Sequence, residues 1–293
     1  MQKTLVAAFT AVMAAVTPFS ASAASRADVV VLMDESGSMS GEQAWIPGTI
    51  NSLNLGLVTA GLTDGNRFGL VGFGASAAPG PSNVRSFSVG GGEFGTAAQF
   101  GAAAAGLQIT GSLEDGYAAI ARANAYTFEP SAARNYILVT DEDRDNSNAS
   151  LTFASMLTSM TSTNTLLNAV VNATFRCGDN SAALGVIGTT GYKANGSGGF
   201  TTCADGTFVS GTGGTIANYV NLALGTGGGA WNLNILRSGG LGATSFTNAF
   251  IDGKVDEIVT QVPGIPEPET YALMLAGLGA MGYMARRRKA SKA

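Results

Sequence analysis

Continuous apolar runs typical of buried strands recur along the middle of the chain. Val29–Met33, Phe68–Phe73 and Tyr136–Thr140 are rich in β-branched and aromatic residues, and Leu166–Phe175 and Trp231–Leu236 are later runs of the same kind. Runs that lack a polar face favour strands whose two sides are both covered. The sequence therefore predicts a sheet buried on both faces.

Between these runs, apolar residues recur at helical spacing. Ile46, Ile50, Leu53 and Leu57 share one helical face after the first run. The segments with a similar pattern are residues 114–126, 150–162, 216–224 and 244–262. Alternation of strands and helices is typical of βαβ crossovers. We therefore expect a doubly wound α/β fold with a mainly parallel sheet and helices on both faces.

Two stretches interrupt this alternation. Residues 75–110 are rich in glycine, alanine and serine, although Val84–Val89 is compatible with an edge strand. Residues 176–215 form an insertion rich in glycine and threonine, with Cys177 and Cys203 near its ends. In an exported chain we expect these two cysteines to form a disulfide, because the compartment is oxidising. Two unpaired buried thiols are the alternative.

The N-terminus has the layout of a secretory signal peptide. Lys3 precedes an apolar run from Leu5 to Val16, and the small residues Ala21-Ser22-Ala23 follow. A basic start, a short apolar helix and a small-residue cleavage site are the parts of such a signal. We therefore expect residues 1–23 to be removed. A membrane or core helix is the alternative, but the run is shorter than the ~20 residues that a span needs.

Residues 263–293 predict a separate tail with a hydrophobic helix. A proline-broken linker containing Pro266, Glu267 and Pro268 leads into the apolar run Tyr271–Ala285. A basic cluster follows directly and consists of Arg286, Arg287, Arg288 and Lys289. The apolar run is marginal for a membrane span, and the basic residues after it would hold that end in the cytoplasm.

In order and content, these parts resemble the PEP-CTERM sorting tail. That tail occurs on exported proteins of Gram-negative bacteria that make extracellular polysaccharide. The resemblance implies processing by an exosortase, transient association with the inner membrane, and a final place at the cell surface or outside the cell. A permanent one-helix membrane anchor is the alternative.

Composition limits what the remaining domain, residues 24–262, can do. The chain of 293 residues is 45% hydrophobic and contains two cysteines and no histidine. A Ser-His-Asp or Cys-His relay is therefore excluded, as is a zinc site that needs imidazole or four thiolates. A formal net charge of −4 and a pI near 4.9 argue against a nucleic-acid partner.

The most informative residues lie directly after the first strand run. Asp34, Ser36 and Ser38 form a D-x-S-x-S turn, whose alternate side chains can converge on one point. In open α/β sheets, ligands bind at the carboxyl ends of the strands, where this turn is expected. Carboxylate and hydroxyl oxygens are hard donors that suit Mg²⁺ or Mn²⁺. The turn therefore predicts a site for a divalent cation.

This turn and the strand before it resemble the metal-ion-dependent adhesion site of the von Willebrand factor type A domain. Tyr136–Asp141 (YILVTD) is similar to that family's later strand ending in Thr-Asp, and Thr226-Gly227-Gly228 is similar to its late turn before the last strand. The resemblance covers about residues 27–262, with the cysteine-flanked segment as an insertion.

The resemblance also implies how the cation is held. Ser36 and Ser38 would be direct ligands, whereas Asp34 and Asp141 would act mostly through water. A metal held by neutral hydroxyls keeps much of its positive charge and can accept one more anionic oxygen from a partner.

One further ligand is harder to place. The family supplies a threonine from a loop with a G-G-T-x-x-G-like context, and this chain has Thr110-Gly111-Ser112-Leu113-Glu114-Asp115-Gly116 there. Leu113 stands at the matching position and cannot bind a metal. Ser112 is the expected hydroxyl, with Thr110 behind it.

The acidic run Asp141-Glu142-Asp143-Arg144-Asp145 permits a second interpretation, because its D-x-D-x-D spacing matches the start of a calcium loop. The match then fails, since Asn146 replaces the required glycine and Thr152 stands in the place of the bidentate glutamate. A solvated acidic loop beside the main site is favoured over an independent calcium site.

These features favour a binding protein that captures an acidic group of a protein or polysaccharide through a divalent cation. A structural matrix protein whose site does not bind is one alternative. A metal-assisted hydrolase is another, with Glu35 and Asp143 as conceivable bases, but no nucleophile elbow, phosphate loop or second metal cluster is evident in the sequence. We therefore do not expect an enzyme.

Overall fold

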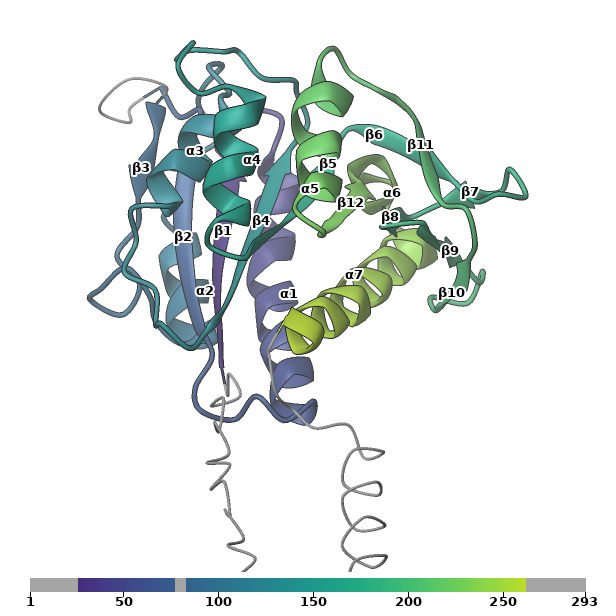
Figure 1. Cartoon of the computed structure of the whole chain (residues 1–293), viewed down its shortest axis with the longest axis horizontal. Helices are drawn as coiled ribbons and strands as arrows, with labels where there is room; N and C mark the ends of the chain where they lie inside the picture. The colour runs from purple at the N-terminus through teal and green to yellow at the C-terminus, as the bar shows by residue number, and fades with distance from the viewer. Residues whose placement is uncertain (1–25, 77–82, 262–293) are drawn as a thin grey trace, which may run out of the picture.

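The computed structural model describes residues 26–76 and 83–261. Its largest element is a nine-stranded sheet with the order β10-β9-β8-β12-β5-β4-β1-β2-β3. The central strands are mutually parallel, and they are β12 (Gly229–Asn232), β5 (Thr165–Val171), β4 (Ala133–Thr140), β1 (Ala27–Asp34) and β2 (Arg67–Phe73). The predicted α/β fold with a mainly parallel sheet is therefore confirmed (Figure 1).

Helices cover both faces of the sheet, as the unbroken apolar strands require. On one face lie α1 (Ser40–Thr59), α2 (Ala97–Ala104) and α7 (Gly240–Gln261). The other face carries α3 (Gly116–Ala123), α4 (Phe153–Thr161), the π-helical turn η2 (Ile216–Val220) and α5 (Asn221–Gly225). The chain therefore forms the doubly wound arrangement that its alternation of strands and helices predicts.

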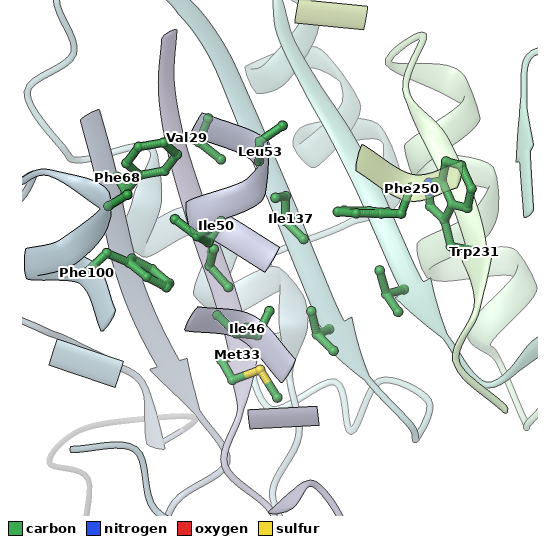
Figure 2. Packing of buried hydrophobic residues seen from close by; sticks show 14 of the residues in the cluster. Val29, Met33, Ile46, Ile50, Leu53, Phe68, Phe100, Ile137, Trp231 and Phe250 are labelled. Atoms are coloured by element: carbon green, nitrogen blue, oxygen red, sulfur yellow. The ribbon is translucent and has the colours of Figure 1, made fainter. Parts of the chain in front are cut away.

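Strand β1 contributes side chains to two hydrophobic clusters, one on each face of the sheet. All eight of its residues are buried. Val29, Val31 and Met33 pack into the cluster under α1 and α7, whereas Val30 and Leu32 pack into the cluster on the opposite face. Figure 2 shows the first cluster, in which Ile46 and Ile50 of α1 approach Met33. Successive side chains of a strand point to opposite faces, so an uninterrupted apolar run fills both.

Two predicted strands have different bounds from those expected. The run Trp231–Leu236 is a strand only to Asn232 and then continues as the short helix α6 (Leu233–Arg237). The Asn232 side chain accepts a hydrogen bond from the backbone N–H of Asn234 at 3.0 Å and so caps this helix. The prediction of a strand over residues 233–236 was wrong, because a short apolar run does not distinguish a strand from a buried helix.

The run Leu166–Phe175 is also divided. It forms β5 and, after Asn172, a separate strand β6 (Ala173–Arg176). Strand β6 lies at the centre of a small three-stranded sheet, between β11 (Thr207–Gly211) and β7 (Ala182–Ala183). The chain therefore leaves the main sheet where the insertion begins.

The insertion is folded and widens the sheet. Strands β8 (Gly185–Ile187), β9 (Thr190–Ala194) and β10 (Phe200–Cys203) add to β12 as antiparallel neighbours. Cys177 and Cys203 form the predicted disulfide, with their Cα atoms 5.9 Å apart. Gly191 of β9 passes beside this bond, and a Cβ atom there would lie 2.6 Å from the Cys203 sulfur. The disulfide thus joins the start of the insertion to its outermost strand.

The weakly patterned stretch 75–110 holds two elements. Strand β3 (Arg85–Ser86) pairs with β2 at the sheet edge, within the segment expected to form an edge strand. Helix α2 was not predicted. Thr96 and Gln99 form a reciprocal capping box at its start, and Phe100 is buried. The alanine-rich helix has too few large apolar residues to show a helical spacing.

The first and last described residues both contact the start of β4, at the end of the domain opposite the carboxyl ends of the parallel strands (Figure 1). The backbone carbonyl of Arg26 accepts a hydrogen bond from the backbone N–H of Ala133 at 3.1 Å, and the Gln261 side-chain amide donates one to the backbone carbonyl of Arg134 at 3.1 Å. In residues 26–76 and 83–261, no helix has the length and apolar character required to cross a membrane. The predicted signal peptide and the tail from residue 263 lie outside the described residues.

Replacing both cysteines by serine is expected to destabilise the domain by about 3 kcal/mol, because the disulfide closes a loop with a sequence separation of 26 residues. Chemical denaturation of the two proteins measures this difference. Limited proteolysis should then cut the double variant first within residues 177–203. An unchanged denaturation midpoint would show that the packing of β8 and β9 alone holds the insertion.

Candidate metal centre

The carboxyl ends of β1 and β4 lie side by side and bring Asp34 next to Thr140. Met33 pairs with Val139 in the parallel ladder, so both strands end at the same level. The Asp34 carboxylate accepts hydrogen bonds from the Ser36 backbone N–H at 2.7 Å and from the Thr140 hydroxyl at 2.7 Å. Burial raises the pKa of Asp34, and these two donors oppose that shift. The turn after β1 is therefore fixed to the end of β4.

The remaining predicted ligands continue this chain of contacts. The hydroxyl oxygens of Ser36 and Ser38 lie 3.1 Å apart, and the Ser38 hydroxyl donates to Asp141 Oδ1 at 3.0 Å. Four residues from two strand ends, Asp34, Ser36, Ser38 and Asp141, thus come together as the sequence predicted. Their oxygens are hard donors gathered at the sheet edge where ligands of α/β folds bind.

A carboxylate that was not predicted completes the cluster. Carboxylate oxygens of Asp34, Glu114 and Asp141 all lie within 4.8 Å of one another. Glu114 is 2% exposed, and its Oε2 has no hydrogen-bond partner among the described residues. Burial, and then the neighbouring charge of Asp34, raise the pKa of Glu114 to about 9. A cation at this point would provide the missing partner and relieve the repulsion between the carboxylates.

The expected hydroxyl ligands, Ser112 and Thr110, lie in the loop that leads to Glu114. Ser112 and Thr110 are both exposed, and the backbone N–H of Thr110 donates to the Glu35 carbonyl at 3.0 Å. Glu114, two residues after Ser112, is the member of this loop that reaches the site. The signal in the sequence was the acidic pair Glu114-Asp115, in which Asp115 caps α3 and thereby places Glu114 at the start of that helix.

Arg237 borders the site and was not predicted either. Its guanidinium contacts Asp141 Oδ2 at 2.9 Å, Glu42 Oε1 at 2.5 Å and the carbonyl oxygen of Ser38 at 3.2 Å. Arg237 lies at the end of α6, the helix that the sequence suggested was a strand. The D-x-S-x-S turn, the carboxylate of Asp141 and the positive charge of Arg237 therefore lie side by side.

Glu35 and Asp143, the conceivable catalytic bases, have structural partners. Glu35 is buried, forms an ion pair with Arg85 and accepts a hydrogen bond from the backbone N–H of Gln108 at 2.7 Å. Asp143 accepts one from the backbone N–H of Gly214 at 2.8 Å. These contacts hold the loops around the site.

The acidic residues that follow β4 also accept hydrogen bonds from neighbouring loops. Asp145 accepts a hydrogen bond from the backbone N–H of Glu114 at 2.6 Å. Within the described parts of the chain, the one cluster of three acidic residues close enough to share an ion is Asp34, Glu114 and Asp141. The run therefore contributes Asp141 to the main site, and its other carboxylates support the loop that carries Glu114.

Comparison with known proteins identifies the tail. Residues 264–289 match the PEP-CTERM protein-sorting motif, which confirms the prediction made from Pro266, Glu267, Pro268 and the arginine cluster. The motif implies export, association with the cell envelope and processing by exosortase-type machinery. A search of curated proteins finds no match.

Solved structures similar to this chain include three proteins, two of which are named as von Willebrand factor type A domains. They are a von Willebrand factor type A protein from Catenulispora acidiphila (22% identity, TM-score 0.35, 50% of this chain and 33% of that one), proximal thread matrix protein 1 from the mussel byssus (16%, 0.36, 51% and 36%), and the SpRpn10 VWA domain (12%, 0.38, 50% and 74%). The match spans about a third of the first two proteins. The strand order of the main sheet, with helices on both of its faces, establishes the α/β fold independently of these similarities.

Glu114→Gln is expected to stabilise the ion-free protein at pH 8 by about 2–4 °C, the change that ~1 kcal/mol produces in a domain of this size. The raised pKa means that the folded state prefers the protonated carboxyl, so stability falls as the pH rises from the ordinary value of 4.5 toward about 9. Thermal unfolding in EDTA at pH 5 and pH 8 measures this. The gain should vanish at pH 5, and an equal gain at both pH values would contradict the assigned charge.

Arg237→Gln is expected to tighten Mg²⁺ binding by about three- to tenfold, because it removes a positive charge that contacts Asp141. Isothermal titration at low salt measures the affinity. Arg122→Gln is a matched control, since Arg122 is exposed in the last turn of α3. Weaker binding in Arg237→Gln would mean that the arginine positions Asp141 more than it opposes the cation.

Proposed function

We propose that this protein is an exported adhesion module that uses a divalent cation to capture an acidic group of a polysaccharide or protein. The observation that carries the proposal is the buried Glu114 oxygen without a partner, which lies with Asp34 and Asp141 beside two serine hydroxyls. Buried carboxylates that face one another destabilise a fold unless a cation or protons compensate them.

The donor set fits Mg²⁺ or Mn²⁺. Ser36 and Ser38 provide neutral hydroxyls, and Asp34, Glu114 and Asp141 provide carboxylates, all of them hard oxygen donors. Ser112 stays a predicted ligand from the sequence, but Glu114 has the stronger support because it is buried in the cluster. When bound, the cation would supply an electrophilic centre for an anionic oxygen of the partner.

Arg237 favours an anionic partner over a neutral one. It is partly exposed, with 30% of its side chain accessible, and it lies beside Ser38 and Asp141. A carboxylate that approached the cation would also meet this guanidinium, which binds planar anions well. Uronate residues of an acidic polysaccharide and aspartate or glutamate residues of a protein share this chemistry.

We propose binding without catalysis. The two conceivable bases, Glu35 and Asp143, are engaged by Arg85 and by the backbone of Gly214. General base catalysis requires a group free to take a proton from water near the metal. A structural matrix protein is the second candidate, and it differs from an adhesion module in needing no cation-dependent partner.

The experiment that tests the proposal measures cation binding and ligand binding separately. Isothermal titration with Mg²⁺ should give one site in the wild type and none in the Ser36→Ala/Ser38→Ala variant. Ser52→Ala is the matched control, because Ser52 is exposed on α1. Retention on immobilised polygalacturonate and on an aspartate-rich peptide is then compared in Mg²⁺ and in EDTA, and retention of either kind that requires Mg²⁺ supports adhesion.

Cation binding without retention on either matrix would favour the structural alternative. Absence of cation binding by the wild type would exclude the proposed site. Equal retention in Mg²⁺ and in EDTA would show that the acidic ligand binds without the metal.

Replacing Arg286–Lys289 by neutral residues is expected to spoil sorting, because these residues should hold the end of the tail in the cytoplasm until the chain is cut near Pro266–Pro268. Peptide mapping of protein from the medium and from membranes measures the outcome. The intact C-terminal peptide on wild-type protein from the medium would contradict removal of the tail, whereas its presence only in membranes would support a permanent anchor.

A further inference from the structure

A layer of polar side chains lies buried between α7 and the sheet, at the opposite end of the strands from the candidate metal centre. Lys254 of α7 is 0% exposed, and its Nζ contacts Asn135 Oδ1 on β4 at 2.8 Å and Glu257 Oε2 at 3.2 Å. Asn135 is 0% and Glu257 8% exposed. A lysine, an asparagine and a glutamate therefore meet inside the protein without a role in the proposed site.

The surroundings disfavour the charged forms of these groups. Glu257 Oε1 is buried and has no hydrogen-bond partner among the described residues, which is unfavourable for a carboxylate and less so for a protonated acid. Burial lowers the pKa of Lys254 and raises the pKa of Glu257, although each opposes the other's shift. Transfer of the lysine proton to Glu257 leaves a neutral amine, which is a nucleophile, beside a carboxylic acid.

The amide of Asn135 is within reach of that amine. A distance of 2.8 Å from Nζ to Oδ1 places the carbonyl carbon within about 4 Å of the nitrogen, because a C=O bond is ~1.2 Å long. The Asn135 amide nitrogen donates to Gln261 Oε1 at 2.6 Å, which fixes the orientation of the amide, with its oxygen toward Lys254 and its nitrogen toward Gln261. Such a fixed approach raises the rate of an otherwise slow reaction.

We propose that Lys254 and Asn135 form an intramolecular amide bond, with Glu257 as the proton-transfer residue. Lys254 Nζ attacks Cγ of Asn135, Glu257 carries a proton from the attacking nitrogen to the amide nitrogen, and the Cγ–Nδ2 bond breaks. One molecule of ammonia leaves, and Glu257 ends as it began. The step needs no oxidant, reductant or further reactant.

A cavity beside Glu257 and Gln261 could receive the ammonia. This cavity, of about 360 Å³, lies at this end of α7, and its walls include Glu257, Gln261 and Asn164. Gln261 is also the acceptor for the amide nitrogen that leaves. The cavity therefore borders the two residues, Glu257 and Gln261, that would receive the proton and hold the amide nitrogen.

Asn168 on the adjacent strand β5 is a less suitable acceptor. Its side chain is already fixed between two partners, since Trp231 Nε1 donates to its Oδ1 at 2.8 Å and its Nδ2 donates to Glu257 Oε2 at 2.6 Å. Lys254 has its direct contact with Asn135. Asn168 instead holds Glu257 in place as a positioning residue.

The bond would join α7 to β4 across 119 positions of sequence. Helix α7 ends at Gln261, and the sorting motif begins at residue 264. A mechanical force applied to the tail during processing, or to the anchored protein outside the cell, would be transmitted first to α7. A covalent bond would keep α7 on the sheet under such a load, which hydrogen bonds and apolar packing resist less well.

Peptide mapping of the exported wild-type protein tests the proposal. Trypsin cuts after Arg134 and Arg144, and an unlinked Lys254 is a further cleavage site. The expected product is residues 135–144 joined to a peptide that begins at Ser238 and continues past Lys254 uncut. Its mass should be about 17 Da below the sum of the two parts, the mass of one ammonia. The intact protein should show the same deficit after reduction of its disulfide.

Glu257→Gln removes the proton-transfer group and should abolish the deficit, whereas Lys193→Arg, a change at a half-buried lysine far from this cluster in the sequence, should leave it unchanged. Lys254→Arg keeps a positive charge and should also abolish it. Recovery of Asn135 and Lys254 in separate peptides of the wild type would overturn the proposal, whether or not the variants fold. A link from Lys254 to Asn168 would overturn the choice of Asn135.

Discussion

The parallel pairing of β1 with β4 is the constraint on which the candidate site depends. It sets the ends of the two strands at one level, and the hydrogen bond from the Thr140 hydroxyl to Asp34 follows directly. A shift of one residue would turn Asp34 toward the opposite face and separate it from Asp141. Since β1 is buried on both sides, such a shift would also move every apolar side chain of the strand into the wrong cluster.

The sequence predicted those parts of the site that local structure determines. Asp34, Ser36 and Ser38 lie in one turn, and Asp141 follows a strand that was recognisable from its apolar run. Glu114 and Arg237 could not be found in this way, because neither directly follows an apolar strand run: Glu114 precedes the cap of α3, and Arg237 ends α6. Arg237 also lies in a helix that the apolar run Trp231–Leu236 had suggested was a strand. Its place depends on the cap that Asn232 provides, a contact that a periodic pattern does not reveal.

For the insertion, composition was a better guide to the structure than the pattern of apolar residues. Its glycine- and threonine-rich segments gave no reliable strand prediction, yet the disulfide was predicted from the compartment and the number of cysteines alone. In the structure, β8 pairs with β12, and Tyr192 of β9 packs against Trp231 with ring centroids 5.1 Å apart. A short strand of this kind gains its stability from such neighbours more than from its own residues, so local propensity is a weak guide.

Two glutamates show how position decides what a buried carboxylate can do. Glu114 and Glu257 each have a buried oxygen without a hydrogen-bond partner among the described residues, and burial raises the pKa of both. Glu114 lies at the carboxyl edge of the sheet beside the carboxylates of Asp34 and Asp141, in the cluster proposed to hold a cation. Glu257 lies under α7 beside Lys254, where the neighbouring charge is already positive and a cation would be repelled. The same group is therefore suited to bind a metal at one end of the domain and to transfer a proton at the other.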